Sequence, residues 1–370
     1  MAVQDVIVVG AGLAGLVCAR RLRQAGHQVC LLEKSRGLGG RLATRRINGV
    51  PFDHGARYLA NHGDRLQQLM RHWCQRQILA PWQPHTYAMG QDGTLQEHST
   101  REPYWVAPAG MNTIGKHLAQ GLTIHQPQQL TRLALTAHNT WELTAELAGD
   151  QREVQHQARA VVLALPAPQI LPILSPLAAI ASVQSLLDSL ATVVYAPMIT
   201  VMAQYDAPLA QATDPLPGSP TTPWMVEGHP DTPLFWVGLD SSKRTTTDTN
   251  VVIHSSAAFA RHWLDRPDWQ RGGEALLAQM GELIANWISQ PKSWQVHRWR
   301  YALVETPGPE PVLTLPAPLP LAACGDWCGH ANLDTALESG WAAAATIHTA
   351  LGGEPLSAFP ASLIESPTHG

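Results

Sequence analysis

The chain has 370 residues, of which 45% are hydrophobic and 15% are charged, and its formal net charge at pH 7 is −4. This composition excludes a disordered chain and predicts one large domain, or two interleaved ones, around a substantial core. The weak negative charge favours neither nucleic-acid binding nor a polybasic membrane patch. No uncharged apolar run reaches the ~18 residues of a membrane-spanning helix.

The cysteines bear on the compartment and on metal binding. Five cysteines, a small and odd number, predict a reducing, cytoplasmic location without a disulfide framework. The spacing of Cys324 and Cys328 suits neither a zinc knuckle nor a thioredoxin-type pair, and the histidines show no convincing ligand spacing, so no metal is expected. The apolar N-terminal run carries Asp5 and lacks a basic segment, so it is not expected to be a signal peptide.

The first predicted elements form one unit. Val6–Val9 is an unbroken apolar run that is typical of a buried parallel strand. Leu13–Ala25 has helical periodicity and is ended by Gly26, and Gln28–Leu32 is a second strand. Strand, glycine turn, helix and strand predict a right-handed βαβ unit.

The rest of the chain alternates between predicted helices, strands and two connections. Residues 206–234 are rich in proline, threonine, aspartate and glycine and predict a surface loop, whereas residues 307–320 hold six prolines and predict an extended connection. The C-terminal part runs from a short strand through a loop into a long helix. The other predicted helices are 64–77, 112–120 and 273–287, and the other predicted strands are 130–135, 140–147, 158–166, 234–239, 251–254 and 294–304.

A glycine motif follows the first strand. Gly10 permits a tight turn, Gly12 lets the backbone approach a pyrophosphate, and Gly15 lets helix and strand pack closely. The helix start at Leu13 and Ala14 offers free N–H groups and a partial positive charge to phosphates. Because strand and helix are both in place, the motif predicts dinucleotide binding rather than a purely structural turn.

An acidic residue and a second glycine pair indicate which nucleotide binds. Glu33, followed by Lys34, ends the second strand, where a carboxylate accepts hydrogen bonds from ribose hydroxyls and repels a 2′-phosphate. This favours NAD or FAD over NADP. Gly39 and Gly40 allow a second close approach of backbone, as FAD requires, and Arg41 can pair with phosphate. The alternative is an exposed basic loop.

These motifs resemble the flavin-containing amine-oxidase superfamily. The segments GLGGRLATRR and FDHGARY are similar to its cofactor motifs, and CGDWCGHANLDTALESGWAAA is similar to its closing motif. The resemblance implies an α/β fold with a Rossmann-type FAD-binding domain of the amine-oxidase and p-hydroxybenzoate-hydroxylase kind, and an inserted α+β substrate domain. It also implies FAD bound non-covalently. The expected boundaries are 1–60, 107–170 and 318–352 for the FAD-binding domain, and 61–106 and 171–317 for the substrate domain.

The resemblance also assigns residues near the flavin. His54, Gly55 and Ala56 are expected beside the flavin ring. Asp326, which follows Gly325, is expected to contact the pyrophosphate or the ribityl chain. A helix start near Leu337 to Gly340, preceded by Ala336, is expected to point at the flavin pyrimidine and to stabilise the negative charge of the reduced ring.

Three further segments are similar to the renalase family: YWVAPAGMNTIGKHLAQGLTIH, VVIHSSAAFARHW and HRWRYALVETP. The resemblance then covers nearly the whole chain. It implies oxidation of the 2- and 6-dihydro isomers of NAD(P)H, with the electrons passed to O2 to give NAD(P)+ and hydrogen peroxide. The expected partners are therefore a dihydronicotinamide dinucleotide and O2.

The candidate substrate wall is aromatic and basic. Loss of a hydride from a dihydropyridine needs an oriented flavin more than a base, and no carboxylate pair or nucleophile triad is evident. Arg57 is a candidate for tuning the flavin or anchoring a substrate amide or carboxylate. The alternatives are core packing for the aromatic residues, an ordinary strand position for the histidine and a surface position for Arg300. The wall comprises Tyr58, His254, Trp299, Arg300 and Tyr301.

Three other functions fit parts of the pattern. An amine oxidase usually adds a lysine that holds a water at the flavin, and of the four lysines only Lys292 lies near the right region. A desaturase or isomerase acting on lipids or isoprenoids would need a long apolar tunnel. A non-catalytic FAD-binding sensor would use the proline-rich loop and the tryptophans as a binding surface.

Overall fold

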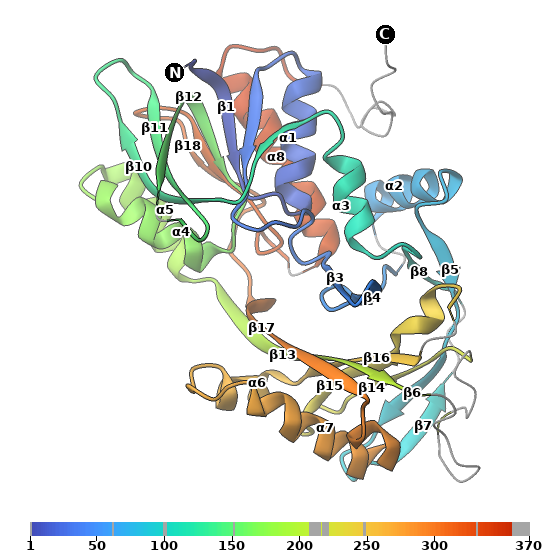
Figure 1. Ribbon diagram of the computed structural model, residues 1–370. Helices are drawn as coiled ribbons and strands as arrows, with labels where there is room; N and C mark the ends of the chain where they lie inside the picture. The colour runs from blue at the N-terminus through green and yellow to red at the C-terminus, as the bar shows by residue number, and fades with distance from the viewer. Residues whose placement is uncertain are drawn as a thin grey trace.

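The structure is a computed structural model that describes residues 2–60, 63–98, 102–150, 152–206, 216, 222–246, 249–330 and 332–356. The described chain forms two lobes, each built on one large β-sheet (Figure 1). No helix within these ranges is long and apolar enough to span a membrane.

The sheet of the first lobe is parallel at its centre. Strand β12 pairs in parallel with β1 and β19, and β2 pairs in parallel with β1 and β9. Antiparallel β11 and β10 extend one edge, and β18 pairs with β19. The strands are β1 (Gln4–Val9), β2 (Val29–Leu32), β9 (Thr123–His125), β10 (Gln128–Leu135), β11 (Trp141–Leu147), β12 (Glu153–Leu163), β18 (Leu313–Leu315) and β19 (Leu321–Ala323).

Helices cover both faces of this sheet because its central strands are apolar on both sides. In β1, Val6 and Val8 belong to one core cluster and Ile7 and Val9 to the other. The first cluster includes residues of α1 (Leu13–Gln24), α2 (Asp64–Gln75), α3 (Asn112–Leu118) and α8 (Leu333–Ala350), and the second includes residues of α4 (Ala167–Leu174) and α5 (Ala181–Ala191).

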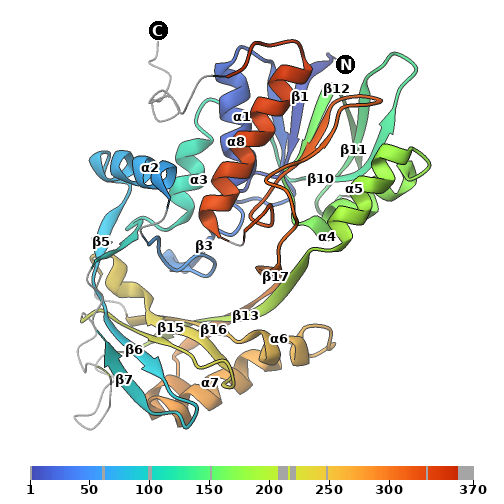
Figure 2. The same ribbon diagram turned by 180° about the vertical axis from the view of Figure 1, so that it is seen from behind.

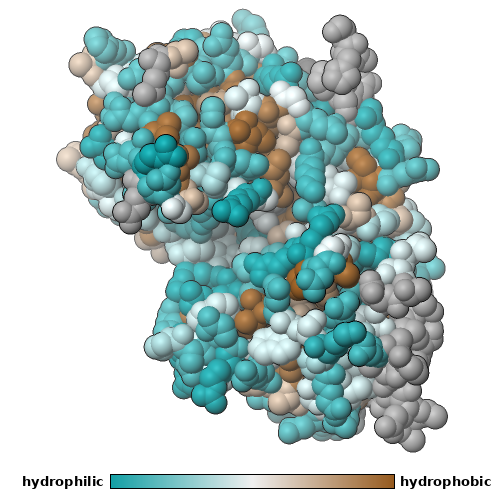
Figure 3. All heavy atoms as spheres, in the orientation of Figure 1, coloured by the Kyte–Doolittle hydropathy of each residue, from teal (hydrophilic) through white to brown (hydrophobic). Residues whose placement is uncertain are grey.

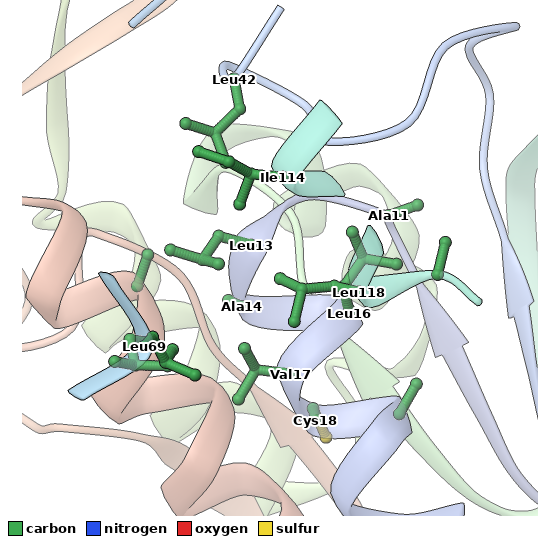
Figure 4. Packing of buried hydrophobic residues seen from close by; sticks show 14 of the residues in the cluster. Ala11, Leu13, Ala14, Leu16, Val17, Cys18, Leu42, Leu69, Ile114 and Leu118 are labelled. Carbon is green, nitrogen blue, oxygen red and sulfur yellow. The ribbon is translucent and has the colours of Figure 1, made fainter. Parts of the chain in front are cut away.

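The long helices α1 and α8 lie side by side on one face of the sheet in both ribbon views (Figure 2). Figure 4 shows Leu13, Leu16 and Val17 of α1 gathered with Leu69 of α2 and Leu118 of α3. This packing fixes the N-terminal end of α1, which begins immediately after the glycine motif.

The second lobe is a sheet in the order β17-β13-β16-β15-β14-β6-β7. Helices α6 (Ala257–Trp263) and α7 (Arg271–Leu283) lie on the side away from the first lobe (Figure 1). The strands are β6 (His85–Met89), β7 (Leu95–His98), β13 (Val194–Tyr205), β14 (Trp224–Glu227), β15 (Leu234–Leu239), β16 (Thr249–Ser255) and β17 (Ser293–Thr306). Between the lobes lie β3 (Thr44–Ile47), β4 (Val50–Asp53), β5 (Ala80–Trp82), β8 (Tyr104–Val106) and the 3-10 turn η2 (Asp240–Lys243), and two further 3-10 turns are η1 (Ser175–Leu177) and η3 (Asn286–Ser289).

Most predicted elements are confirmed, and the exceptions lie in the second half of the chain. The predicted loop 206–234 contains β14, although its residues 207–215 and 217–221 lie outside the described ranges. The predicted connection 307–320 contains β18, and the predicted helix 273–287 divides into α7 and η3. Strands β3 to β9 and β13 and helices α4, α5 and α6 were not predicted. Strand β13 is the longest of these. Its apolar run contains Pro197, which sits at a register shift opposite β17.

The domain boundaries remain a prediction, and the packing bears on two of them. Helices α2 and α5 and the second half of α4 fall within the ranges assigned to the substrate domain, but their buried residues pack in the two core clusters of the first sheet. Residues 85–98 and 194–306 supply the strands of the second sheet.

A buried ionic cluster joins the lobes. The Asp53 carboxylate of β4 accepts from Arg244 at 2.7 Å, and Arg244 also bonds Asp240 at 2.7 Å. The ammonium of Lys243 bonds the other oxygen of Asp240, and none of these four side chains is more than 7% exposed. Burial raises the pKa of Asp240, but Lys243 and Arg244 outweigh it and lower the pKa to about 2. Two acids thus balance two bases at the junction.

Asp240→Asn should destabilise the protein strongly. The substitution leaves two buried cations facing one carboxylate, and such broken pairs cost about 3–5 kcal/mol. The free energy of unfolding in urea measures the loss. Asp265→Asn is the control, because it removes an exposed pair with Arg300 worth less than about 1 kcal/mol. Similar small losses in both variants would contradict a joining role for the cluster.

Candidate active site

A cavity of about 1260 Å³ lies between the two lobes. Its lining comes from the glycine motif, from residues 32–45 and 54–58, and from β16, β17 and the segment before α8. Figure 3 shows that the molecular surface is drawn in where the lobes meet. The volume exceeds that of an ordinary drug-sized pocket, which suits a dinucleotide together with a substrate.

The nucleotide end of the cavity is built by the glycine motif. A Cβ on Gly10, whose φ is +102°, would lie 2.4 Å from the carbonyl oxygen of Ala164, and a Cβ on Gly15 would lie 2.0 Å from the carbonyl oxygen of Gly10. No atom lies within 4 Å of the Cβ position of Gly12, so this position is open toward the cavity. The start of α1 carries no side-chain cap. This arrangement fits a pyrophosphate against the helix start.

Glu33 is buried directly after β2, and backbone N–H groups hold its carboxylate in place. One carboxylate oxygen accepts from the Ala11 N–H at 2.7 Å, and the other accepts from the Ser35 N–H at 2.7 Å. The neighbouring Lys34 lines the cavity and donates to Gln169. Each carboxylate oxygen has further lone pairs, so the group can also accept from ribose hydroxyls.

Arg41 and Asp326 bind each other. Two guanidinium nitrogens contact the two carboxylate oxygens at 2.6 Å, and Tyr195 donates to Asp326 at 3.2 Å. Burial lowers the pKa of Arg41, but Asp326 more than offsets it. Arg41 was predicted to pair with phosphate, and the structure gives it a carboxylate partner from the far end of the chain. Gly325 beside it also lines the cavity.

The helix start expected near Leu337 lies one turn earlier. Helix α8 begins at Leu333 because Asn332 caps it by accepting from the Thr335 N–H at 2.8 Å. Ala336 lines the cavity as expected, whereas Leu337 is fully buried in the core of the first lobe. Gly15 likewise packs against backbone and is not among the lining residues.

The loop after β4 forms one wall. Its residues His54, Gly55 and Ala56 all line the cavity. The indole N–H of Trp299 donates to the His54 carbonyl at 2.9 Å, and the two rings stack 5.3 Å apart. The ring of His297 lies 4.8 Å from that of His54. The loop of the first lobe is therefore held by β17 of the second lobe.

The histidines of this wall are neutral. Burial, with the nearby His297 and Arg45, lowers the pKa of His54 to about 3. Burial and Arg45 lower the pKa of His297 to about 4. The ring nitrogen Nδ1 of His54 has no hydrogen-bond partner among the described residues. This nitrogen is a buried polar atom whose hydrogen bond is unmade among the described residues.

Another part of the lining gathers Arg57 and aromatic rings. The guanidinium carbon of Arg57 lies 4.7 Å from the ring centre of Phe235 and 5.2 Å from that of Tyr58. Tyr58 in turn lies 4.1 Å from Tyr104, centre to centre. All but Tyr104 line the cavity. Arg57 thus sits on aromatic faces, without a carboxylate partner among the described residues.

His254 reaches the cavity from β16. It is 2% exposed, and its Nε2 has no hydrogen-bond partner among the described residues. Burial, together with Arg57, lowers its pKa well below the usual value. The ring lies 5.6 Å from Trp236. A buried, neutral and unpartnered nitrogen in a cavity wall is a candidate contact for a ligand.

The structure separates the other residues of the predicted wall. Tyr301 lines the cavity, but its ring packs edge-on against Tyr195, near Asp326. Arg300 borders the cavity but is exposed, and it pairs with Asp265 at 2.7 Å. A register shift between β13 and β17 follows Trp299 and interrupts strict alternation.

Several lining residues were not assigned a role from the sequence. His297 alternates with Trp299 in the segment that resembles renalases, so alternation was an available signal. Phe235 and Met198 sit in apolar strands and carry no such signal. Arg45 belongs to a run of basic residues that also suits an exposed loop.

The glycine motif, the buried acid and the interlobe cavity define an FAD-dependent oxidoreductase with a Rossmann-type sheet. Residues 8–73 match the NAD(P)-binding Rossmann-like domain, and residues 88–348 match the flavin containing amine oxidoreductase family. The second match spans more than half of the chain. The protein therefore belongs to the flavin containing amine oxidoreductase family.

Individual relatives refine this placement. The chain is 24% identical to renalase from Mus musculus over 358 residues, which cover 90% of this chain and 96% of renalase. This match confirms a renalase-like member of the superfamily. A putative flavin-containing monoamine oxidase from Mycobacterium tuberculosis is 49% identical, but over 55 residues that cover 15% of this chain and 12% of that protein.

Solved structures share the fold. A double mutant of putrescine oxidase superposes with a TM-score of 0.67 at 15% identity, covering 94% of this chain and 99% of that one. Cyclohexylamine oxidase from Brevibacterium oxydans IH-35A superposes with a TM-score of 0.61 at 13% identity, covering 95% and 100%. These likenesses confirm the predicted fold class.

Glu33→Gln should weaken FAD binding. The amide keeps one acceptor oxygen but turns an NH2 group toward a backbone N–H, and loss of a bond to a charged group costs about 1.5–3 kcal/mol. The dissociation constant for FAD, measured by reconstituting the apoprotein, should rise about 10- to 150-fold. The apoprotein should still fold, as circular dichroism would report. Unchanged flavin affinity would remove Glu33 from the ribose site.

Acid should destabilise the protein through the cavity histidines. A histidine in the unfolded chain has a pKa near 6.5, so below that pH it becomes protonated. The folded rings stay neutral at the same pH, and protonation therefore favours the unfolded chain. Stability is complete above pH 6.5 and is lost as pH falls toward about 4, by up to about 2 kcal/mol per ring at pH 5. The free energy of unfolding in urea should fall less between pH 7 and pH 5 in His297→Gln than in the parent protein.

His98→Gln, at an exposed strand position, is the control for this measurement. An equal loss of stability in the two variants would mean that His297 is not neutral in the folded protein.

Proposed function

We propose that the protein oxidises the 2- and 6-dihydro isomers of NADH or NADPH, with hydride transfer to FAD, and that O2 reoxidises the flavin and yields hydrogen peroxide. The full-length similarity to renalase supports this proposal. The observation that carries it is the charge of the cavity wall, which suits an anionic substrate.

The cavity lining is basic. Among the described lining residues the carboxylates are Glu33 and Asp326, and Asp326 is already paired with Arg41. Four further arginines line the cavity at positions 45, 57, 298 and 300. Such a surface attracts the diphosphate of a dinucleotide and disfavours a protonated amine.

Amine oxidation is the second candidate, because the solved structures that share the fold include amine oxidases. The described lysines argue against it. Lys292 lies on an exposed turn and pairs with Asp206, and the buried Lys243 pairs with Asp240 without lining the cavity. Lys34 does line it, but at the ribose end beside Glu33. Lys116 is exposed on α3 and does not line the cavity. No described lysine therefore lies in the cavity lining away from the ribose end.

The residues of the cavity provide orientation rather than acid–base chemistry. Bound FAD would supply the hydride acceptor. Loss of hydride from a dihydropyridine leaves an aromatic ring, so no proton has to be removed from carbon. The ring pair of His54 and Trp299 and the neutral His254 offer stacking surfaces and an unpartnered nitrogen for a nicotinamide amide. Arg57 adds a fixed positive charge.

The test is anaerobic reduction of the flavin. Treatment of NAD+ with borohydride gives a mixture of 2-, 4- and 6-dihydro isomers, and flavin absorbance near ~450 nm reports reduction. We expect rapid bleaching by the mixture, and neither pure 4-dihydro NADH nor a panel of amines should match it. Bleaching by an amine would instead support amine oxidation. Absence of bleaching by every compound would refute the proposed function.

A further inference from the structure

Arg45 is an unusual cation in the cavity wall. It lies on β3, is half-buried and lines the cavity. Its one hydrogen bond to a described residue is a long one, from Nη1 to the Gln295 side-chain oxygen at 3.4 Å. No carboxylate of the described residues lies within ion-pair distance, and an unpaired arginine at a cavity is available to an anion.

The other arginines of this wall are engaged. Arg300 pairs with Asp265, and Arg298 donates to the Leu264 carbonyl while its guanidinium lies 4.9 Å from the Trp269 ring centre. The guanidinium carbon of Arg57 lies 4.7 Å from the ring centre of Phe235. Arg45 differs from these arginines because it lines the cavity with one long hydrogen bond and no ion pair or ring contact among the described residues.

The surroundings of Arg45 preserve its charge. Arg45, His54 and His297 all line the cavity, and the positive charge of Arg45 contributes with burial to lowering the pKa of both rings. These rings are neutral, so they neither cancel its charge nor add a second one. Gln295, its one partner, lies toward the exposed start of β17. The guanidinium therefore bonds an exposed residue and carries its charge at the cavity lining.

We propose that Arg45 binds the phosphate groups of the substrate, so that the cavity holds the diphosphate of a dihydronicotinamide dinucleotide as well as its ring. This inference rests on the proposed function. An arginine at this place can donate two parallel hydrogen bonds to a phosphate while the nicotinamide lies deeper, among the wall residues. The adenosine part then extends toward solvent.

The experiment compares substrates with and without phosphate on the flavin-loaded enzyme. Borohydride-treated NAD+ is compared with borohydride-treated nicotinamide riboside, which carries no phosphate. In Arg45→Gln, the second-order rate constant for anaerobic flavin reduction by the dinucleotide should fall about 10- to 100-fold, while that for the riboside should stay unchanged. Raising the salt concentration should slow the dinucleotide reaction more in the parent than in the variant.

Arg46→Gln is the matched control. Arg46 is the next residue on β3, is exposed, bonds the Ala109 carbonyl at 2.9 Å and does not line the cavity. This variant should behave like the parent with both substrates. A stability defect alone would not change the ratio between the two substrates, so that ratio separates a binding role from a structural one.

The outcomes distinguish the inference from the proposed function. Equal losses with both substrates, or no loss with either, would overturn the role of Arg45 and leave the function standing. A loss of FAD from Arg45→Gln would show that the arginine serves the cofactor phosphates and would also overturn the inference. If the parent flavin is reduced by neither isomer mixture, the proposed function fails and the inference fails with it.

Discussion

The buried ionic cluster at the lobe junction is the constraint on which the cavity depends. Asp53 ends β4, and the next residue in the chain is His54, the first of the cavity loop. Arg244 and Asp240 hold Asp53 from the second lobe, and the Met111 N–H and the Thr44 hydroxyl hold it from the first. With the end of β4 fixed on both sides, the loop backbone has one position relative to both sheets. The distance between the walls follows from that position.

The charges of the site are arranged in two different ways. At the nucleotide end, each charged group has a partner: Glu33 accepts from backbone, and Arg41 pairs with Asp326. Across the substrate wall, Arg45 and Arg57 lack carboxylate partners among the described residues, and the histidines beside them are neutral. Paired charges suit a cofactor that stays bound, because no charged group is left without a partner when the substrate leaves. Uncompensated charges suit a molecule that comes and goes.

The parts of this site that the sequence predicts are those encoded locally. Gly10, Gly12 and Glu33 act within one βαβ unit, where chain order sets the geometry. The pairing of Arg41 with Asp326 was beyond prediction because their separation in the sequence is 285 residues. The true start of α8 was within reach, since Asn332 is a favoured N-cap residue. The sequence does not single out Arg45 from the basic residues around it, because its isolation from carboxylates depends on how distant segments such as β17 are placed in the fold.

The contacts of the Arg41–Asp326 pair extend across the junction. Arg41 also donates to the Ala302 carbonyl of β17 at 3.3 Å, and Tyr195 of β13 donates to Asp326. Two strands of the second-lobe sheet therefore contact the Arg41–Asp326 ion pair. A substrate that tightens these contacts raises the affinity for flavin, and by thermodynamic linkage bound flavin raises the affinity for that substrate by the same factor.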